Sequence, residues 1–102
     1  MHTDELSSML VPIVSKYPVN RAAFFGSYAR NEQTPNSDID LLLDLGTNEM
    51  FPELYYVFDL LNEMETATGK NIDYITTNGL ASSPIRKLKA NIANERVWFY
   101  ER

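Results

Sequence analysis

The sequence predicts an α/β fold, in which a small mixed central sheet carries helices packed on it. Patterns typical of helices and strands alternate along the chain in the order helix, strand, short helix, strand, helix, strand and helix. The composition, 44% apolar and 12% aromatic, is that of a packed globule. Because 102 residues lie within the usual size range of one domain, we expect a single domain over residues 1–102.

The first two elements follow from apolar spacing. Thr3 is a fair N-cap for a helix, and Pro12 lies inside the helical pattern. The apolar residues that keep this pattern are Leu6, Met9, Leu10 and Ile13. Residues 22–25 form an apolar run that is long enough for a buried strand and too short for a helix.

A second strand follows a turn and a loop. Residues 27–31 are typical of a strand-to-helix turn, and residues 33–37 are a polar loop. Residues 38–45 are the strongest strand pattern in the chain. Its alternating apolar residues are Ile39, Leu41 and Leu43, and Leu42 adds apolar character to the other face.

A long helix that ends at Gly69 is predicted next. Its apolar face is expected to consist of Leu54, Val57, Phe58, Leu61, Met64 and Ala67. Its acidic residues are interpreted as the solvent-facing side: Asp59, Glu63 and Glu65. Residues 71–76 are then a third strand.

The end of the chain is expected to hold a last helix. An Asn78-Gly79 turn precedes it, Ser83 can cap it and Pro84 can occupy its first position. The residues expected to point inward from it are Ile85, Leu88 and Ile92. Residues 97–100 are either a final short strand or a docked tail.

Composition narrows the possible chemistry. Cysteine is absent and the single histidine, His2, lies at the N-terminus, which excludes thiolate chemistry and favours oxygen-ligated magnesium or manganese over zinc. Asp4 and Glu5 stand where a signal peptide would carry basic residues, and no apolar run approaches membrane-spanning length. We therefore expect a cytoplasmic protein with no membrane partner.

The charge is unevenly distributed along the chain. A net charge of −5 argues against direct nucleic-acid binding through phosphate neutralisation. From Pro84 onward, however, five basic residues stand against two acidic ones. This tail offers a local basic face for a triphosphate or an acidic partner, and a solvated helix face is the equally good alternative.

Two aspartates form a pair at the start of the strongest strand. Asp38 and Asp40 are two apart, so both carboxylates project to the same face. Like charges this close gain most when a divalent cation lies between them. Taken alone, such a pair is more often an ordinary polar start to a strand.

Two further features accompany this pair. Gly26 and Ser27 lie between a strand and a helical turn, where backbone N–H groups and a hydroxyl can bind phosphate oxygens, although most such pairs are simply turns. Asp73 lies among apolar residues of the third strand. Its alternative is a strand residue that faces solvent at a sheet edge.

The combination of these elements resembles a known signature. Gly-Ser-Tyr-Ala-Arg at 26–30, Ser-Asp-Ile-Asp-Leu-Leu-Leu at 37–43 and Ile-Asp-Tyr at 72–74 occur in order. This run resembles the signature of the DNA polymerase beta type nucleotidyltransferase superfamily over roughly residues 20–76. The small size resembles its minimal nucleotidyltransferase branch, whose members are commonly paired with HEPN-domain proteins as antitoxins.

The resemblance implies a polymerase beta-like fold and a role for each matching residue. Gly26 and Ser27 would contact the triphosphate of ATP or another nucleoside triphosphate. Asp38 and Asp40 would hold two Mg²⁺ ions, with Mn²⁺ as the substitute. Asp73 would complete the metal ligands and serve as a base for the acceptor hydroxyl. Arg30 matches the motif's arginine, either as a phosphate ligand or as an ion-pair partner of a nearby acid.

The chain departs from the family pattern at two positions in this region. Asn31 stands where the family often has Gly, and Asn tolerates the left-handed conformation better than most residues. Asn36 replaces a frequent Asp in the loop before the aspartate pair. We expect the turn to survive the first change, and we expect the second to alter little.

The leading functional hypothesis is an enzyme that transfers AMP from ATP to a protein hydroxyl, with a tyrosine of a cognate HEPN toxin as the acceptor. One alternative is an inactive antitoxin that neutralises its partner by occlusion. Another is nucleotidyl transfer to a small molecule, for which larger relatives use extra domains that 102 residues cannot supply.

Overall fold

A computed structural model describes residues 3–46, 56–81 and 86–102, with the side chains of Arg86 and Leu88 excepted. The elements, in chain order, are α1 (Thr3–Val14), β1 (Arg21–Phe25), α2 (Gly26–Ala29), β2 (Ile39–Asp44), α3 (Val57–Thr68), β3 (Ile72–Thr76), α4 (Thr77–Ala81), α5 (Arg86–Glu95) and β4 (Val97–Glu101). The predicted alternation of helices and strands is confirmed. No helix in the described ranges has the length and apolar character needed to cross a membrane.

The four strands form one mixed sheet, as predicted. Their order across the sheet is β3-β2-β1-β4. β1 is antiparallel to both β2 and β4, whereas β2 and β3 are parallel. The alternative left open for residues 97–100 is thus resolved as a strand, and β3 and β4 are the two edges of the sheet.

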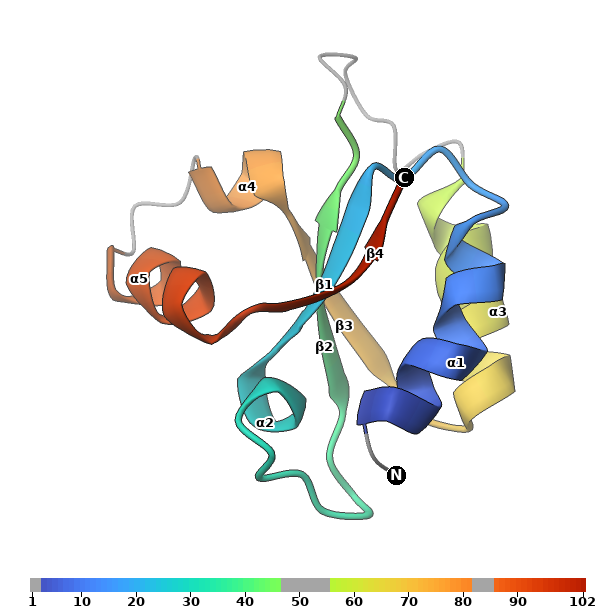
Figure 1. Ribbon diagram of the computed structural model, residues 1–102, viewed down its shortest axis with the longest axis horizontal. Coiled ribbons are helices and arrows are strands. Elements are labelled where there is room, and N and C mark those ends of the chain that lie inside the picture. The colour runs from blue at the N-terminus through green and yellow to red at the C-terminus, as the bar shows by residue number, and fades with distance from the viewer. Residues whose placement is uncertain (1–2, 47–55, 82–85) are drawn as a thin grey trace.

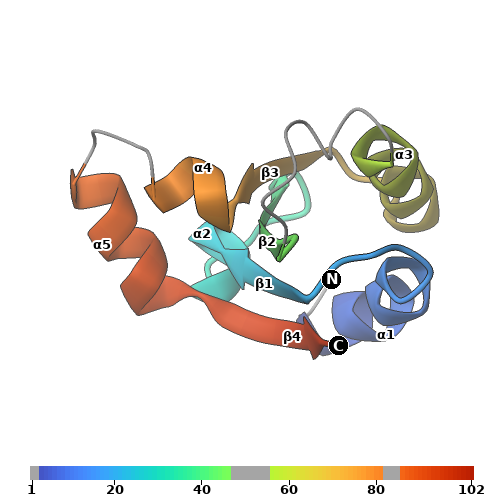
Figure 2. The same ribbon diagram turned by 90° about the horizontal axis from the view of Figure 1, so that it is seen from above.

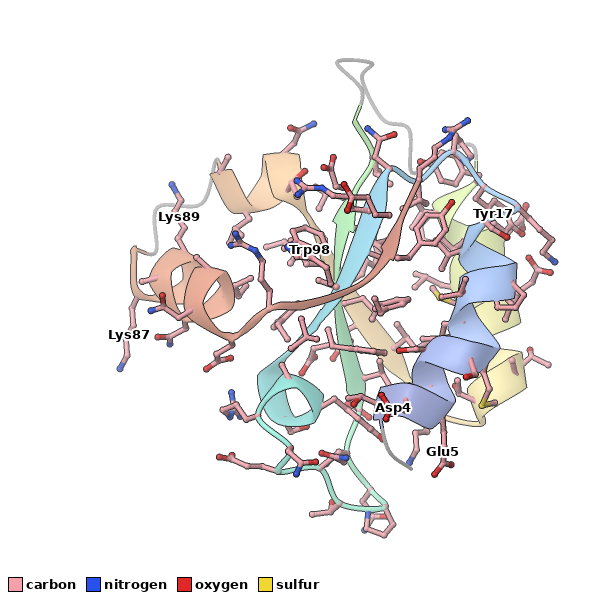
Figure 3. All side chains as sticks on the ribbon, in the orientation of Figure 1. Asp4, Glu5, Tyr17, Lys87, Lys89 and Trp98 are labelled. Atoms are coloured by element: carbon pink, nitrogen blue, oxygen red, sulfur yellow. The ribbon has the colours of Figure 1, made fainter. Side chains whose placement is uncertain are left out.

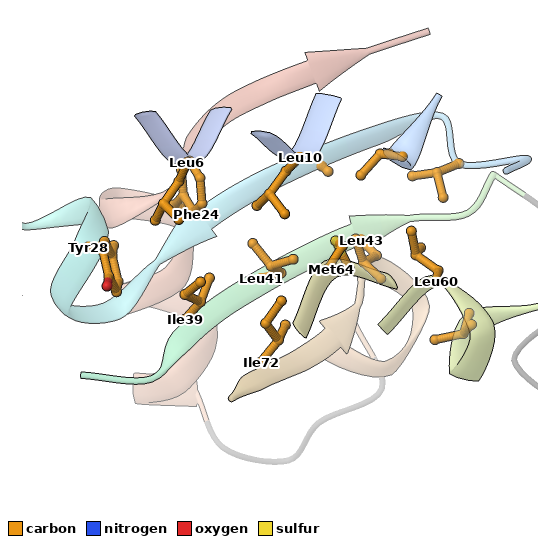
Figure 4. Close-up of a cluster of buried hydrophobic side chains, with 14 of the residues drawn as sticks. Leu6, Leu10, Phe24, Tyr28, Ile39, Leu41, Leu43, Leu60, Met64 and Ile72 are labelled. Atoms are coloured by element: carbon orange, nitrogen blue, oxygen red, sulfur yellow. The ribbon is translucent and has the colours of Figure 1, made fainter. Parts of the chain in front are cut away.

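The helices lie on both faces of the sheet. Figures 1 and 2 show α1 and α3 side by side on one face, with α4 and α5 on the other. The alternation along β2 explains this arrangement, since Ile39, Leu41 and Leu43 are fully buried in the cluster that α1 and α3 cover (Figure 4). Asp40 and Leu42 consequently belong to the opposite face.

The second face has a much smaller core. Its buried residues are Ala23, Leu42 and Ile92, around which pack the partly buried Phe25, Ile75, Leu80 and Trp98. Among the described side chains, α4 contributes Leu80 to this cluster and α5 contributes Ile92. Polar groups at this face can therefore remain within reach of solvent.

The predicted apolar face of α3 is confirmed at Val57 and Met64 and wrong at Phe58 and Ala67. The helix buries Val57, Leu60, Met64 and Thr68, whereas Phe58 is 61% exposed and Ala67 is exposed. Packing against α1 and the sheet selects the stripe that contains Leu60, and Phe58 lies about 160° away from it around the helix. Leu54 lies outside the described residues.

Two other local predictions are corrected. Asn78 and Gly79 lie inside α4 rather than in a turn, because the Gly79 N–H donates to Thr76 Oγ1 at 2.9 Å and starts a helical turn directly after β3. Thr3 is the first helical residue of α1 rather than its cap, and Pro12 lies inside that helix. The caps predicted at Ser83 and Pro84 lie outside the described residues.

We expect Leu41→Ala to lower the free energy of unfolding by about 3 kcal/mol, because it opens a cavity at a fully buried position in a central strand. Phe58→Ala removes a larger side chain that is mostly in solvent, so its effect should stay within about 0.5 kcal/mol. Urea denaturation of both variants measures the difference. An equal loss in the two variants would mean that Phe58 faces the core after all.

Candidate active site

The sheet register brings Asp40 and Asp73 together. In the parallel β2/β3 pair Asp40 lies opposite Asp73, and on the other side of β2 it lies opposite Phe25 of β1. Residues opposite each other in a ladder point to the same face, so both carboxylates lie on the thinly covered side of the sheet. Asp73 is also exposed to solvent on an edge strand, as the alternative interpretation of this residue predicted.

Electrostatics show that Asp38 belongs to the same group. The pKa of Asp40 is raised above its usual value, first by partial burial and then by the negative charges of Asp73 and Asp38. The nearby charge of Arg30 acts in the opposite direction. Asp73 and Asp38 therefore both lie close enough to Asp40 to act on its charge.

The backbone of Gly26 lies directly against Asp40. Gly26 has a φ of +70°, and a Cβ at this position would lie 2.3 Å from Asp40 Oδ2. Only glycine satisfies both the left-handed backbone and this close approach. The Gly26-Ser27 turn, which is predicted to bind phosphate, thus lies beside the Asp40 carboxylate.

The turn is closed by backbone hydrogen bonds. The Arg30 N–H donates to Gly26 O at 3.1 Å, and the Glu32 N–H donates to Ser27 O at 2.9 Å. Asn31 takes a left-handed conformation with a φ of 58°. Asn at this position is therefore compatible with the turn, as expected from its tolerance of that conformation.

Arg30 forms two ion pairs at this turn. Its Nε lies 3.1 Å from Glu32 Oε2 and its Nη1 lies 3.1 Å from Glu95 Oε2, at the end of α5. Both acids raise the pKa of the guanidinium. Arg30 is thus an ion-pair partner of nearby acids, which was one of its two predicted roles. The other role, phosphate binding by Arg30, remains a prediction.

The donor set fits a hard cation that shares its ligands with a substrate. All three side chains are carboxylates, and a divalent cation would relieve the repulsion around Asp40. Within the described residues, no three His, Cys, Asp or Glu side chains are grouped closely enough to hold a metal ion. Magnesium commonly uses one or two carboxylates together with substrate phosphates, which this arrangement permits.

Sequence reasoning missed a residue that fixes the position of β3. Glu65 of α3 accepts a hydrogen bond of 3.0 Å from the Ile72 N–H, next to Asp73. Glu65 is half-buried, and Glu63 accepts hydrogen bonds from Lys16 and Tyr17, so neither is simply a solvated acid. Helical spacing alone carries no signal for such a contact, because the partner is in another element.

Comparisons with known proteins find similarity over most of the chain. Residues 8–99 match the family described as nucleotidyltransferase domain. The chain is 40% identical to the "Putative protein adenylyltransferase MJ0435" of Methanocaldococcus jannaschii, over 95% of this chain and 97% of that protein.

Two solved structures share the fold at low sequence identity. One is a toxin-antitoxin with AMP-PNP, with a TM-score of 0.69, 16% identity and coverage of 94% of this chain and 73% of the other. Another is a tri-AMPylated Shewanella oneidensis HEPN toxin in complex with an MNT antitoxin. It has a TM-score of 0.64 and 12% identity, and it covers 97% of this chain and 72% of the other.

We expect Asp40→Asn to stabilise the fold at pH 7 by about a few tenths of a kcal/mol, a small gain because the carboxylate remains partly solvated. The folded chain binds this proton more tightly than the unfolded chain does, so the associated stability is present at low pH and lost as the pH rises through the folded-state pKa. Urea titrations should show the gain of the variant shrinking as the pH falls through the folded-state pKa and disappearing below about 4. A variant less stable than the original chain at pH 7 would contradict this electrostatic description.

We expect Gly26→Ala to cost more stability than Gly69→Ala, although the two φ values are +70° and +68°. Gly69 has nothing within 4 Å of an added Cβ, so its replacement should cost only the backbone strain, about 1 kcal/mol. At Gly26 the methyl group also displaces the Asp40 carboxylate. A double-mutant cycle with Asp40→Ala should recover at least about 0.5 kcal/mol of the Gly26→Ala loss, and strict additivity would refute the contact.

Proposed function

Since the chain belongs to the nucleotidyltransferase domain family, we propose that it transfers AMP from ATP to a hydroxyl group of a partner protein. The observation that carries this proposal is the placement of Asp40 opposite Asp73, with the backbone of Gly26 against Asp40. Carboxylates for a metal and a turn for phosphates are then side by side. The identity to a protein named as an adenylyltransferase supports AMP as the group that is moved.

Each residue has a proposed role in the reaction. Gly26 and Ser27 would bind the triphosphate. Asp38, Asp40 and Asp73, together with the substrate phosphates, would hold two Mg²⁺ ions, for which Mn²⁺ could substitute. Bound magnesium would neutralise charge on the α-phosphate and lower the pKa of the attacking hydroxyl. Asp73 accepts the proton as the hydroxyl oxygen bonds to the α-phosphorus, and the bond to the bridging oxygen of pyrophosphate breaks.

Arg30 is proposed as an additional phosphate ligand. Its guanidinium carries five N–H donors, of which the contacts to Glu32 and Glu95 use two. Arg30 is also close enough to Asp40 to lower that carboxyl's pKa. A phosphate bound beside the three aspartates would therefore lie within the electric field of the Arg30 guanidinium.

We propose a tyrosine of a HEPN toxin as the acceptor, which makes the chain an antitoxin. Support comes from the fold shared with the MNT antitoxin complex, in which the HEPN toxin is tri-AMPylated. The fold shared with a toxin-antitoxin bound to AMP-PNP supports an adenine nucleotide as the donor. The proposed site lies on an open sheet face, so a partner protein can present its own hydroxyl there.

The test is transfer of label from ATP to a co-expressed HEPN-domain partner in the presence of magnesium. We expect Asp38→Asn and Asp40→Asn each to reduce labelling by more than about a hundredfold, because each removes a metal ligand worth several kcal/mol in the transition state. Asp59→Asn is the matched control, since Asp59 is exposed on α3, which covers the other face of the sheet. It should label the partner normally.

Two outcomes would contradict the proposal. Full labelling by both site variants would mean that these aspartates are not the metal site. If the partner remained neutralised after loss of all three aspartates, with no label on it, the chain would act by occlusion. Measuring toxin activity and label in the same samples separates these outcomes.

A further inference from the structure

A pocket lies on the same face of the sheet as the aspartates. It has a volume of about 340 Å³ and is formed by β1, β2 and β4 together with α4 and α5. Its apolar lining includes Leu42, Leu80 and Trp98, and its basic lining consists of Arg21, Lys89 and Arg96. The proposed nucleotidyl-transfer chemistry uses none of these residues.

Among the described residues, no ion pair balances the positive charge of Lys89 and Arg96 in the pocket. Arg21 is neutralised by Asp44, with Nη2 and Oδ2 2.9 Å apart, and its guanidinium lies 4.2 Å from the centre of the Trp98 ring. Arg96 lies 5.6 Å from the same ring, and Lys89 Nζ donates to Ala81 O at 2.8 Å. None of the described lining residues is acidic. Two cations therefore face a pocket in a chain whose net charge is −5.

The pocket is close to the proposed transfer site. Leu42 is two residues after Asp40 on β2, and a strand advances about 3.3 Å per residue, so the two Cα atoms are about 7 Å apart. Side chains at alternate positions of a strand share a face. A peptide that places a hydroxyl at Asp40 would thus place a residue only two or three positions away over the pocket.

We propose that this pocket binds an acidic side chain on the segment of the partner protein that carries the acceptor hydroxyl. The apolar part contacts the stem and neighbours of that side chain, and Lys89 and Arg96 pair with its carboxylate. The inference rests on the proposed function, which requires a protein acceptor at this face. Of the two ligands that the sequence analysis considered for the basic tail, this inference selects the acidic partner.

Charge favours the acceptor over the donor as the occupant. The phosphates of the nucleotide donor are assigned to the turn at Gly26 and to the three aspartates. The nucleoside part of the donor carries no charge. A nucleoside in this pocket would leave Lys89 and Arg96 without a counter-ion. An acidic peptide supplies the missing negative charge.

Trp98 provides a direct measurement, because it is the only tryptophan in the chain. Its fluorescence can be followed while the full chain is titrated with the peptide Glu-Glu-Tyr-Glu-Glu or with Gln-Gln-Tyr-Gln-Gln. We expect a saturable change with the glutamate peptide, and binding about tenfold weaker with the glutamine peptide. Added salt should weaken the glutamate complex alone.

Variants on one helix locate the binding. Lys89→Gln and Arg96→Gln should each weaken the glutamate peptide by about fivefold or more. Lys87→Gln removes the same charge from a residue of α5 that does not line the pocket, and Figure 3 shows the side chains of Lys87 and Lys89 extending in opposite directions from this helix. Lys87→Gln should bind like the original chain.

Several results would overturn the assignment. Equal affinity for the two peptides, or equal weakening by Lys87→Gln and Lys89→Gln, would exclude an acidic side chain in the pocket. Competition of ATP with the glutamate peptide would make the pocket a donor site. The titration needs no turnover, so a chain that binds the glutamate peptide yet labels no partner would overturn only the proposed function. Normal partner labelling by Lys89→Gln and Arg96→Gln would overturn only the pocket assignment.

Discussion

The arrangement of the site depends on one unfavourable interaction, the repulsion between carboxylates on adjacent strands. The parallel register of β2 and β3 places Asp40 directly opposite Asp73, and Asp38 adds a third negative charge nearby. Burial and the charges of Asp73 and Asp38 oppose ionisation of Asp40, and the charge of Arg30 offsets this effect only in part. The stability that offsets it comes from the other face of the sheet, where Ile39 and Leu41 are fully buried beneath α1 and α3.

The difference between the two faces of the sheet follows from the alternation of side chains along β2. In β2, odd-numbered residues build the large core and even-numbered residues face the smaller cluster of Ala23, Leu42 and Ile92. A thin layer over the second face leaves space for the carboxylates and for the basic pocket. A more extensive apolar cover there would add stability and would close the site.

The sequence allowed prediction of features that depend on local rules. Asp38 and Asp40 share a face because strands repeat every two residues, and Asn31 accommodates a left-handed turn because of its side chain. The partner of Asp40 could be expected only through the resemblance, since register between β2 and β3 is a long-range property. The phase of α3 was mistaken at Phe58, because several apolar residues competed for one stripe. The pocket was missed because Arg21 is distant in the chain from Lys89 and Trp98.

The ion pair between Arg30 and Glu95 connects the turn that is proposed to bind phosphate to the end of α5, the helix that contributes Lys89 to the basic pocket. Through this contact, a ligand that shifts α5 changes the surroundings of the turn, and a ligand at the turn changes those of α5 by the same free energy. A partly exposed pair of this kind contributes about 0.2–1 kcal/mol. Cooperativity through this route between the ligands proposed for the turn and for the pocket is therefore limited to about fivefold in affinity.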